Sequence, residues 1–219
     1  HFHASLNPHS QFKKSITMEA VLRSHKVADP LTLLDCSPIS DGAAAIIITR
    51  DNKQKTGSGR TVSIVASAVA TDTLGLAQRE SLTELKATKI AALRAYKQAS
   101  VDPTDIDLIE LHDCFTIAEL LALEDLGVTK KGDVAARVRR GEFTLGSASR
   151  TVINPSGGLK GCGHPIGATG VKQVVEIVEQ LRGAAGKRQV SGARVGLAHN
   201  VGGTGATAVV HILKRGIEA

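Results

Sequence analysis

The chain has 219 residues, of which 42% are hydrophobic and 22% charged, a composition typical of a globular protein of one or two domains. Only 2% are aromatic and none is Trp, so we expect no base-stacking surface and no nucleic-acid partner. No apolar run approaches the ~18 residues that span a bilayer. Three cysteines, an odd number, favour a reducing, intracellular compartment over a disulfide scaffold; mitochondrion, peroxisome-like organelle and cytoplasm all stay open.

Residues 1–50 contain few regular elements. Thr17 is placed to cap a short helix over Thr17–Ser24, and Asp41-Gly42 leads into an expected strand over Ala43–Thr49. Residues 51–60, DNKQKTGSGR, are polar and rich in Gly and Ser, which indicates a linker.

From residue 61 onward, expected strands alternate with expected helices. The strands are Thr61–Ala70, Asp107–His112, Thr151–Ile153, Arg194–His199 and Thr207–Leu213. The amphipathic helices are Glu80–Ala99, one around Ile117–Leu121, and one after Gly167 with Val171, Val174, Val175, Val178 and Leu181 on one face. This alternation predicts an α/β fold with a largely covered sheet.

Much of the formal charge of +6 lies in residues 130–150, which hold six basic residues against two acidic ones. One interpretation is a solvated basic helix and loop. The other is a surface that receives an anionic ligand.

The stretch LHDCF, residues 111–115, is the first candidate for chemistry. His112 and Cys114 would share one face at the carboxyl end of a strand, where open α/β sheets place their sites. Imidazoles beside Cys114 could hold it partly as thiolate, although a buried Cys and a core His are the plain alternative. Asp113 would point to the other face, which favours a structural role.

The stretch GCGHPIGATG, residues 161–170, is the second candidate. A run of glycines indicates tight turns or close approach of another chain or ligand. His164 precedes Pro165, which suits a helix start, where the positive end of the helix would keep the ring neutral and able to act as a base or a donor. We expect Cys162 to be a small filler.

The third candidate is AHNVGGTG, residues 198–205. Gly202 and Gly203 could present backbone N–H groups as an oxyanion hole, or simply form a hairpin turn. His112, Cys114 and His164 are acceptable zinc ligands but lack paired spacing, so we expect no metal. No Gly-Lys-Ser/Thr follows the glycines, which excludes a phosphate-binding loop, whereas a Cys-His hydrolase stays open.

Taken together, NPSGG followed by GHPIGATG, HDCF about forty residues upstream, and the Gly-rich turn near the C-terminus resemble the C-terminal half of a thiolase. HDCF in place of the usual NEAF is similar to the sterol-carrier-protein type. The stretch LTLLDCSPISDGAAA resembles the last strand of the family's N-terminal half. Residues 1–50 would then hold the end of the loop domain and that strand, and residues 61–219 the C-terminal domain.

The resemblance implies a five-layered αβαβα fold of two similar halves that acts on acyl-CoA. The reaction would be thiolysis of a 3-ketoacyl-CoA or the reverse Claisen condensation, with coenzyme A as substrate, no further cofactor, and a homodimer or tetramer. His164 would activate the nucleophilic cysteine and help hold the thioester oxygen, and His112 would join it. Cys114 would be the acid/base.

One departure from conventional thiolases is that the Cys of their Cys-x-Gly motif is replaced by Asn200, while the Gly202 N–H could still complete the oxyanion hole. Asn200 and Gly163 are the expected substrate contacts. The nucleophile belongs to the N-terminal half and nothing here matches it, since Cys36 starts the wrong strand and is expected to be buried structure. An N-terminal thiolase half is therefore the expected partner.

Two other functions compete with an enzyme half. One is a non-catalytic acyl-CoA-binding or scaffold subunit that has kept the fold. The other is a relative of the ketoacyl synthases, which share the fold but usually present a His and Asn pair that HDCF does not suit.

Overall fold

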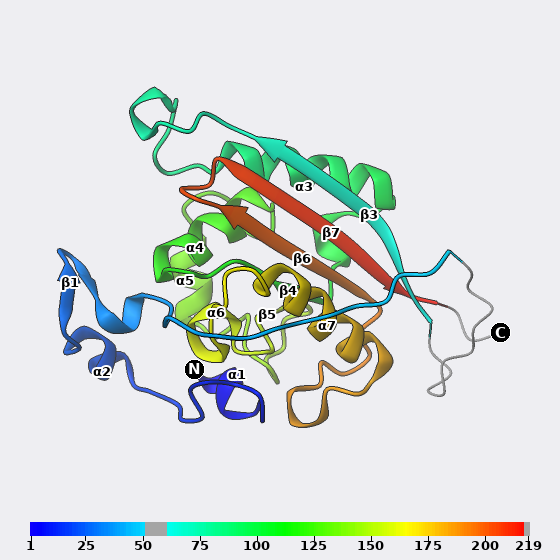
Figure 1. Ribbon diagram of the computed structural model, residues 1–219, viewed down its shortest axis with the longest axis horizontal. Helices are drawn as coiled ribbons and strands as arrows, with labels where there is room; N and C mark the ends of the chain where they lie inside the picture. The colour runs from blue at the N-terminus through cyan, green and yellow to red at the C-terminus, as the bar shows by residue number, and fades with distance from the viewer. Residues whose placement is uncertain (51–60, 217–219) are drawn as a thin grey trace.

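A mixed five-stranded sheet with the order β3-β7-β6-β4-β5 forms the centre of the computed structural model, which describes residues 1–50 and 61–216 (Figure 1). β4 lies parallel to β5 and β6, whereas β7 is antiparallel to β6 and β3, because β6 and β7 are joined by a short hairpin. The strands are β3 (Val62–Thr71), β4 (Leu108–Glu110), β5 (Val152–Ile153), β6 (Val195–Gly202) and β7 (Thr207–Arg215).

Helices cover both faces of this sheet. α3 (Lys86–Ala99) packs on one face together with α4 (Thr116–Asp125), and α7 (Thr169–Arg182) packs on the other. Neighbouring side chains of β6 show the alternation, since His199 contacts Thr88 of α3 and Asn200 contacts Gln173 of α7. The sheet is thus the middle of three layers.

The two faces carry two apolar cores. On the α3 side, fully buried Leu197 and Ile212 pack against a row of alanines that lets the helix approach closely. On the α7 side, Leu108, Ile177 and Leu181 are fully buried. Each such side chain contributes about 1.5–3 kcal/mol on burial, so these cores hold the strand ends in place.

The remaining elements are short. They are α1 (Phe2–Ser5), α2 (Met18–Leu22), β1 (Lys26–Ala28), β2 (Leu31–Thr32), α5 (Val134–Arg139), α6 (Gly158–Cys162), and the 3₁₀ turns η1 (Leu33–Asp35), η2 (Leu76–Gln78), η3 (Pro103–Asp105) and η4 (Gly186–Arg188). Thr17 caps α2 by accepting from the Ala20 N–H at 3.1 Å, which confirms that prediction. None of the helices described is long and apolar enough to cross a membrane.

All five predicted strands of residues 61–219 form, with boundaries that shift by up to three residues, and β6 runs on to Gly202. α3 begins at Lys86 and not at Glu80, since Asp125 accepts from the Leu85 N–H at 2.6 Å and holds the preceding segment in another path. β4 ends at Glu110, two residues before His112. The next backbone N–H, that of Leu111, donates to the Asn154 side chain at 2.8 Å and not to a neighbouring strand.

The expected strand over Ala43–Thr49 is wrong. This segment forms no strand among the described residues, and Ile47 and Ile48 are 94% and 69% exposed. A strand needs a neighbouring backbone for its N–H and C=O groups, and the apolar pattern alone does not supply one. The expected linker, residues 51–60, lies outside the described residues.

The basic stretch, residues 130–150, fits the solvated interpretation better than a ligand surface. Arg137 and Arg140 both pair with Glu142, at 2.6 Å each, and Arg150 pairs with Asp107 at 2.9 Å. Three of the six basic side chains of this stretch are therefore paired with carboxylates of the protein itself and not with an outside anion.

Gly196 sits where β6 passes under α7, and it tests the packing of this face. A Cβ at this position would come within 2.5 Å of Ile177 Cγ2, so Gly196→Ala is expected to lower the free energy of unfolding by about 1–3 kcal/mol through overpacking. Gly167→Ala is the control, since nothing lies within 4 Å of its Cβ position. Urea denaturation measures both; equal midpoints would contradict the close α7–β6 contact.

Candidate active site

Hydrogen bonds from the end of β4 position the loop that carries the NPSGG motif. The Glu110 carboxylate accepts from the backbone N–H and the hydroxyl of Ser156, at 2.9 and 2.7 Å. Burial, reinforced by the charge of Glu176, raises the pKa of Glu110 to about 8. Asp113 accepts from the N–H groups of Leu159 at 2.6 Å and of Lys160, which begin α6. Asp113 therefore has the structural role expected for it.

Two glycines of this region are required by their surroundings. Gly158 has φ +62°, and a Cβ there would lie 2.3 Å from Asp113 Oδ2. Gly163 has φ +114°, and its Cβ would lie 3.0 Å from Ser40 Oγ. Both positions combine a backbone conformation that favours glycine with close contact to another segment.

The two loops bring His112 and His164 together. Their ring centroids are 5.1 Å apart and the rings are nearly perpendicular, at 89°. His112 is buried, at 7% exposed, and its Nδ1 has no hydrogen-bond partner among the described residues. His164 is half-buried. The histidines come from the carboxyl edge of β4 and β5, as expected of an α/β site.

Burial keeps both rings neutral. It lowers the pKa of His112 to about 4, with the neighbouring His164 adding to the effect. Burial also lowers the pKa of His164, and the charge of Lys172 lowers it further. The expectation that a helix start would do this is wrong, because α7 begins at Thr169 and His164 lies in the preceding turn.

Asn200 connects the histidine pair to α7. Its side chain hydrogen-bonds to His112 and donates to Gln173 Oε1 at 3.0 Å. Gln173, fully buried, also donates to the His199 carbonyl at 3.0 Å. Gly202 follows two residues along β6, about 7 Å further by strand geometry, before the hairpin. Asn200 and Gly163 remain predicted substrate contacts.

Cys114 lies two residues beyond His112 and is half-buried. Burial, followed by the charge of Asp113, raises the pKa of its thiol. Of the two alternatives left open for Cys114, a partial thiolate or a buried thiol, the raised pKa favours the protonated thiol. Cys36 is half-buried and not fully buried as expected, with its thiol near the Thr32 carbonyl.

A segment from residues 36–40 runs between the two loops. Ser37 donates its N–H to the Cys114 carbonyl at 2.8 Å, and the backbones of Cys36 and Phe115 form an isolated antiparallel β-bridge. At the other end, Ser40 Oγ accepts from the His164 N–H at 3.2 Å. This crossing segment, residues 36–40, thus contacts both site loops.

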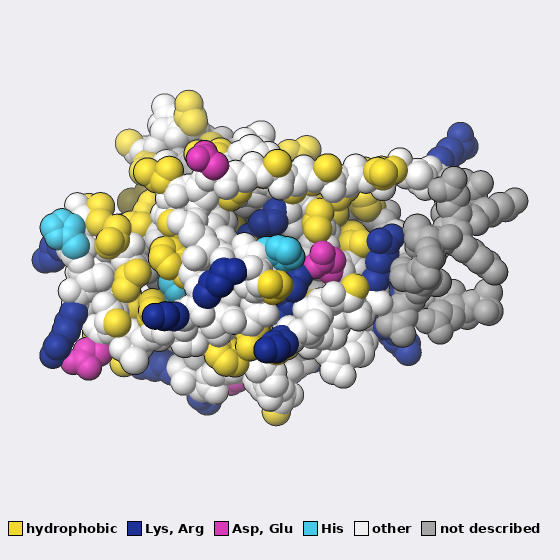
Figure 2. All heavy atoms as spheres, turned by 60° about the horizontal axis from the view of Figure 1, so that its bottom comes forward, with side chains coloured by type: hydrophobic (Ala, Val, Ile, Leu, Met, Phe, Trp, Pro, Cys, Tyr) yellow, Lys and Arg dark blue, Asp and Glu magenta, His cyan; other side chains and the backbone are white. Residues whose placement is uncertain are grey.

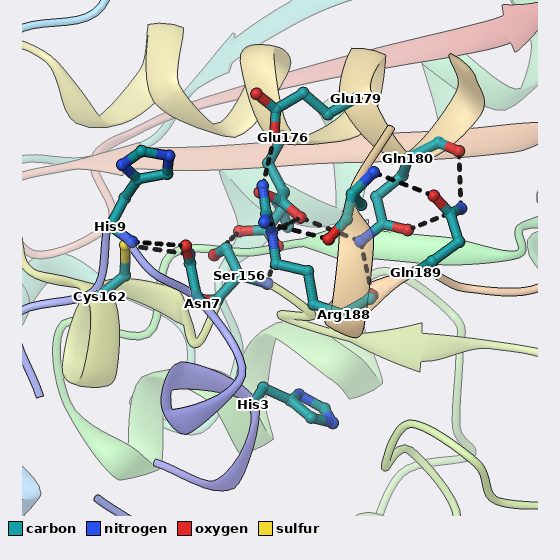
Figure 3. Close-up of polar contacts among 12 residues, drawn as sticks. His3, Asn7, His9, Ser156, Cys162, Glu176, Glu179, Gln180, Arg188 and Gln189 are labelled. Carbon is teal, nitrogen blue, oxygen red and sulfur yellow. Dashed lines mark hydrogen bonds and ion pairs between the residues drawn. The ribbon is translucent and has the colours of Figure 1, made fainter. Parts of the chain in front are cut away.

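A cavity of about 670 Å³ lies behind the His164 loop and shares Gly163, Pro165 and Cys162 with it. Charged side chains of α7 line it, and Arg188 holds Glu176 through two contacts at 2.8 and 3.0 Å (Figure 3). On the face drawn in Figure 2, histidine, acidic and basic side chains also lie close together near the centre. His112, Cys114 and His164 do not line this cavity, which is therefore adjacent to the histidine pair but separate from it. The histidine pair is the candidate active site.

Thr169 and Gln173 were not among the predicted site residues. Thr169 Oγ1 lies 2.7 Å from His164 Nδ1, and Gln173 holds Asn200. The sequence contains a feature that could have indicated each of them. Thr169 is a hydroxyl residue five positions after His164, and Gln173 is a polar residue between the valines of an amphipathic helix. Among the described residues, no three His, Cys, Asp or Glu side chains converge as metal ligands.

Because the pKa of His112 is depressed on folding, stability should depend on pH. The unfolded chain binds a proton at His112 with a pKa near 6.5 and the folded chain only near 4. Between these values the unfolded state binds more protons, so the free energy of unfolding should fall as pH falls from about 6.5 to 4. His112→Asn should flatten this slope in urea titrations at several pH values; an unchanged slope would contradict the depressed pKa.

Comparisons with known proteins agree with this architecture. Residues 68–215 match the family described as Thiolase C-terminal domain-like. The chain is 50% identical over 215 residues to an acetyl-CoA acetyltransferase of Methanothermobacter thermautotrophicus, and 44% identical over 199 residues to sterol carrier protein 2 of Gallus gallus. These alignments cover 98% and 89% of this chain but only 56% and 36% of the relatives.

Two solved structures share the fold. An Ltp2-ChsH2(DUF35) aldolase superposes with a TM-score of 0.80 at 23% identity, over 97% of this chain and 55% of that one. An SCP2-thiolase-like protein of Mycobacterium smegmatis gives 0.70 at 17% identity, over 100% and 44%. The chain thus spans about half the length of these proteins.

The sheet with helices on both faces and the two motif-bearing loops at its carboxyl edge are those of a thiolase C-terminal domain, and the chain belongs to the thiolase superfamily. Within it, the chain is similar in sequence to sterol carrier protein 2, as the HDCF motif led us to expect.

Proposed function

We propose that the chain is the catalytic C-terminal half of an acyl-CoA thiolase that transfers an acyl group between a cysteine of the other half and coenzyme A. The observation that carries this proposal is the pair of neutral, perpendicular histidines, His112 and His164, with the thiol of Cys114 two residues along the same loop. The relatives named acetyl-CoA acetyltransferase support an acyl-CoA substrate.

In the proposed reaction, His164 acts first as a base. In thiolysis, its neutral ring takes the proton from the nucleophilic cysteine, whose sulfur attacks the 3-keto carbonyl carbon of the 3-ketoacyl-CoA and forms a bond to it. The resulting imidazolium then donates a hydrogen bond to the oxyanion, together with His112 and the Gly202 N–H. When the carbonyl re-forms, the bond between this carbon and the α-carbon breaks, the electron pair stays on the α-carbon of the departing acyl-CoA, and acyl-cysteine remains.

Cys114 supplies the second proton transfer. Its raised pKa keeps the thiol protonated at neutral pH, so it can protonate the leaving α-carbon in thiolysis. The thiolate thus formed takes the proton of the incoming coenzyme A sulfur, which attacks the acyl-cysteine. The bond between the acyl carbon and the cysteine sulfur then breaks, and the cysteine recovers its proton from the His164 imidazolium. Cys114 returns to its starting state, and the cycle needs no further cofactor.

A non-catalytic acyl-CoA-binding subunit is the second candidate. It is favoured by one observation, the 44% identity over 199 residues to a protein named sterol carrier protein 2. Such a subunit would have no need for neutral histidines in contact.

The proton-transfer role of Cys114 predicts a specific kinetic change. In a protein that contains both thiolase halves, Cys114→Ala should lower turnover about 10²–10⁴-fold, the usual effect of losing a general acid/base. The variant has no thiol to protonate the α-carbon of the leaving group. Cys36→Ala is the matched control and should retain turnover. Steady-state thiolysis of acetoacetyl-CoA measures both; a greater loss from Cys36→Ala would contradict the assignment.

Exposed apolar side chains predict that this chain needs a second thiolase half. Ile39 and Ile47 are 100% and 94% exposed, and large uncovered apolar patches drive association. Expressed alone, residues 1–219 should self-associate and show no thiolysis. Supplying an N-terminal half with the nucleophilic cysteine should restore a defined species in gel filtration and turnover. Full thiolysis by the isolated chain would overturn the proposed division of labour.

A further inference from the structure

Thr169 is the first residue of α7 and is 1% exposed. Its hydroxyl oxygen has two polar neighbours, His164 Nδ1 at 2.7 Å and the Pro165 carbonyl oxygen at 3.0 Å. The turn between α6 and α7 brings both neighbours to it, since the Pro165 carbonyl also accepts the N–H groups of Ala168 and Thr169 at 2.9 Å. The hydroxyl therefore sits between the imidazole and the backbone.

The single hydroxyl proton decides which neighbour donates. A carbonyl oxygen can only accept, so the 3.0 Å contact to Pro165 is a hydrogen bond only if the Thr169 hydroxyl donates to it. The oxygen is then left to accept at 2.7 Å, and His164 Nδ1 must carry a proton. The opposite tautomer would place the hydroxyl oxygen and the carbonyl oxygen 3.0 Å apart with no proton between them.

A neutral imidazole has one N–H group, and the other nitrogen then holds a free lone pair. We propose that Thr169 is a positioning residue that fixes the His164 proton on Nδ1, so that Nε2 is the basic nitrogen. The consequence for catalysis rests on the proposed function, because Nε2 would then be the atom that takes the cysteine proton.

The surroundings of His164 support this assignment. Burial and the charge of Lys172 lower the pKa of His164, so the ring is neutral and the choice of tautomer matters at pH 7. Lys172 lies one helical turn after Thr169 on α7, and the backbone N–H of His164 is held by Ser40. His164 is thus held at two points, its backbone N–H by Ser40 and its ring by Thr169.

The tautomer is measured directly by ¹⁵N NMR of histidine-labelled protein that contains both thiolase halves, with the His164 signals assigned by His164→Gln. The wild type should show Nδ1 protonated and Nε2 unprotonated. Thr169→Val, which keeps the shape and removes the hydroxyl, should show a mixture of tautomers. Thr169→Ser should restore the wild-type pattern.

Kinetics supply the second readout. Thr169→Val should lower kcat for thiolysis on the order of 10²-fold, the size expected when a reacting group loses its productive arrangement, with little change in KM. Thr169→Ser should recover most of this loss. The matched control is Thr88→Val, which removes an equally buried hydroxyl that contacts His199 at 2.9 Å on the other face of the sheet and should leave the His164 tautomer unchanged.

A wild-type His164 with its proton on Nε2 would overturn the inference, as would a Thr169→Val protein with wild-type tautomer and kcat. Should Thr169→Val fail to fold, the wild-type and Thr169→Ser spectra still decide. A wild type with Nδ1 protonated but without thiolysis would refute the proposed function and leave the assignment of Thr169 intact.

Discussion

The attachment of the NPSGG loop to the end of β4 is the constraint on which the site depends. Glu110 and Asp113 are buried acceptors that receive hydrogen bonds from this loop, Glu110 from the N–H and hydroxyl of Ser156 and Asp113 from the N–H groups that begin α6. Buried polar groups cost free energy unless they are paired, so the loop has one low-energy position relative to the strand. Since His112 lies between the two carboxylates and His164 follows α6, fixing the loop also fixes the distance between the two imidazoles.

The sheet and its covering helices could be predicted because they follow from local pattern. The valines at helical spacing indicated α7, and β3, β6 and β7 formed close to their expected limits. The failures share one cause, which is contact with distant residues. Asn154 ends β4 early, and the apolar stretch at Ala43–Thr49 has no neighbouring backbone among the described residues.

The sequence predicted which residues form the candidate site, but not the protonation of the Cys114 thiol or the residues that position the site. The motifs indicated His112, Cys114 and His164, and the structure places the two rings in contact. The cause of their protonation states could not be read from the sequence, because it is burial: it favours the protonated thiol among the two alternatives for Cys114, and it keeps His164 neutral without a helix start. Thr169 and Gln173 were missed since each acts through another side chain.

The crossing segment, residues 36–40, has a consequence for how the site can vary in evolution. It holds the Cys114 carbonyl with Ser37 and the His164 N–H with Ser40, so the length of chain between these two serines sets the separation of the loops. An extended residue spans about 3.3 Å. One inserted or deleted residue between them would therefore have to be absorbed by one of the two loops, and homologous sequences should keep the number of residues between these two positions constant.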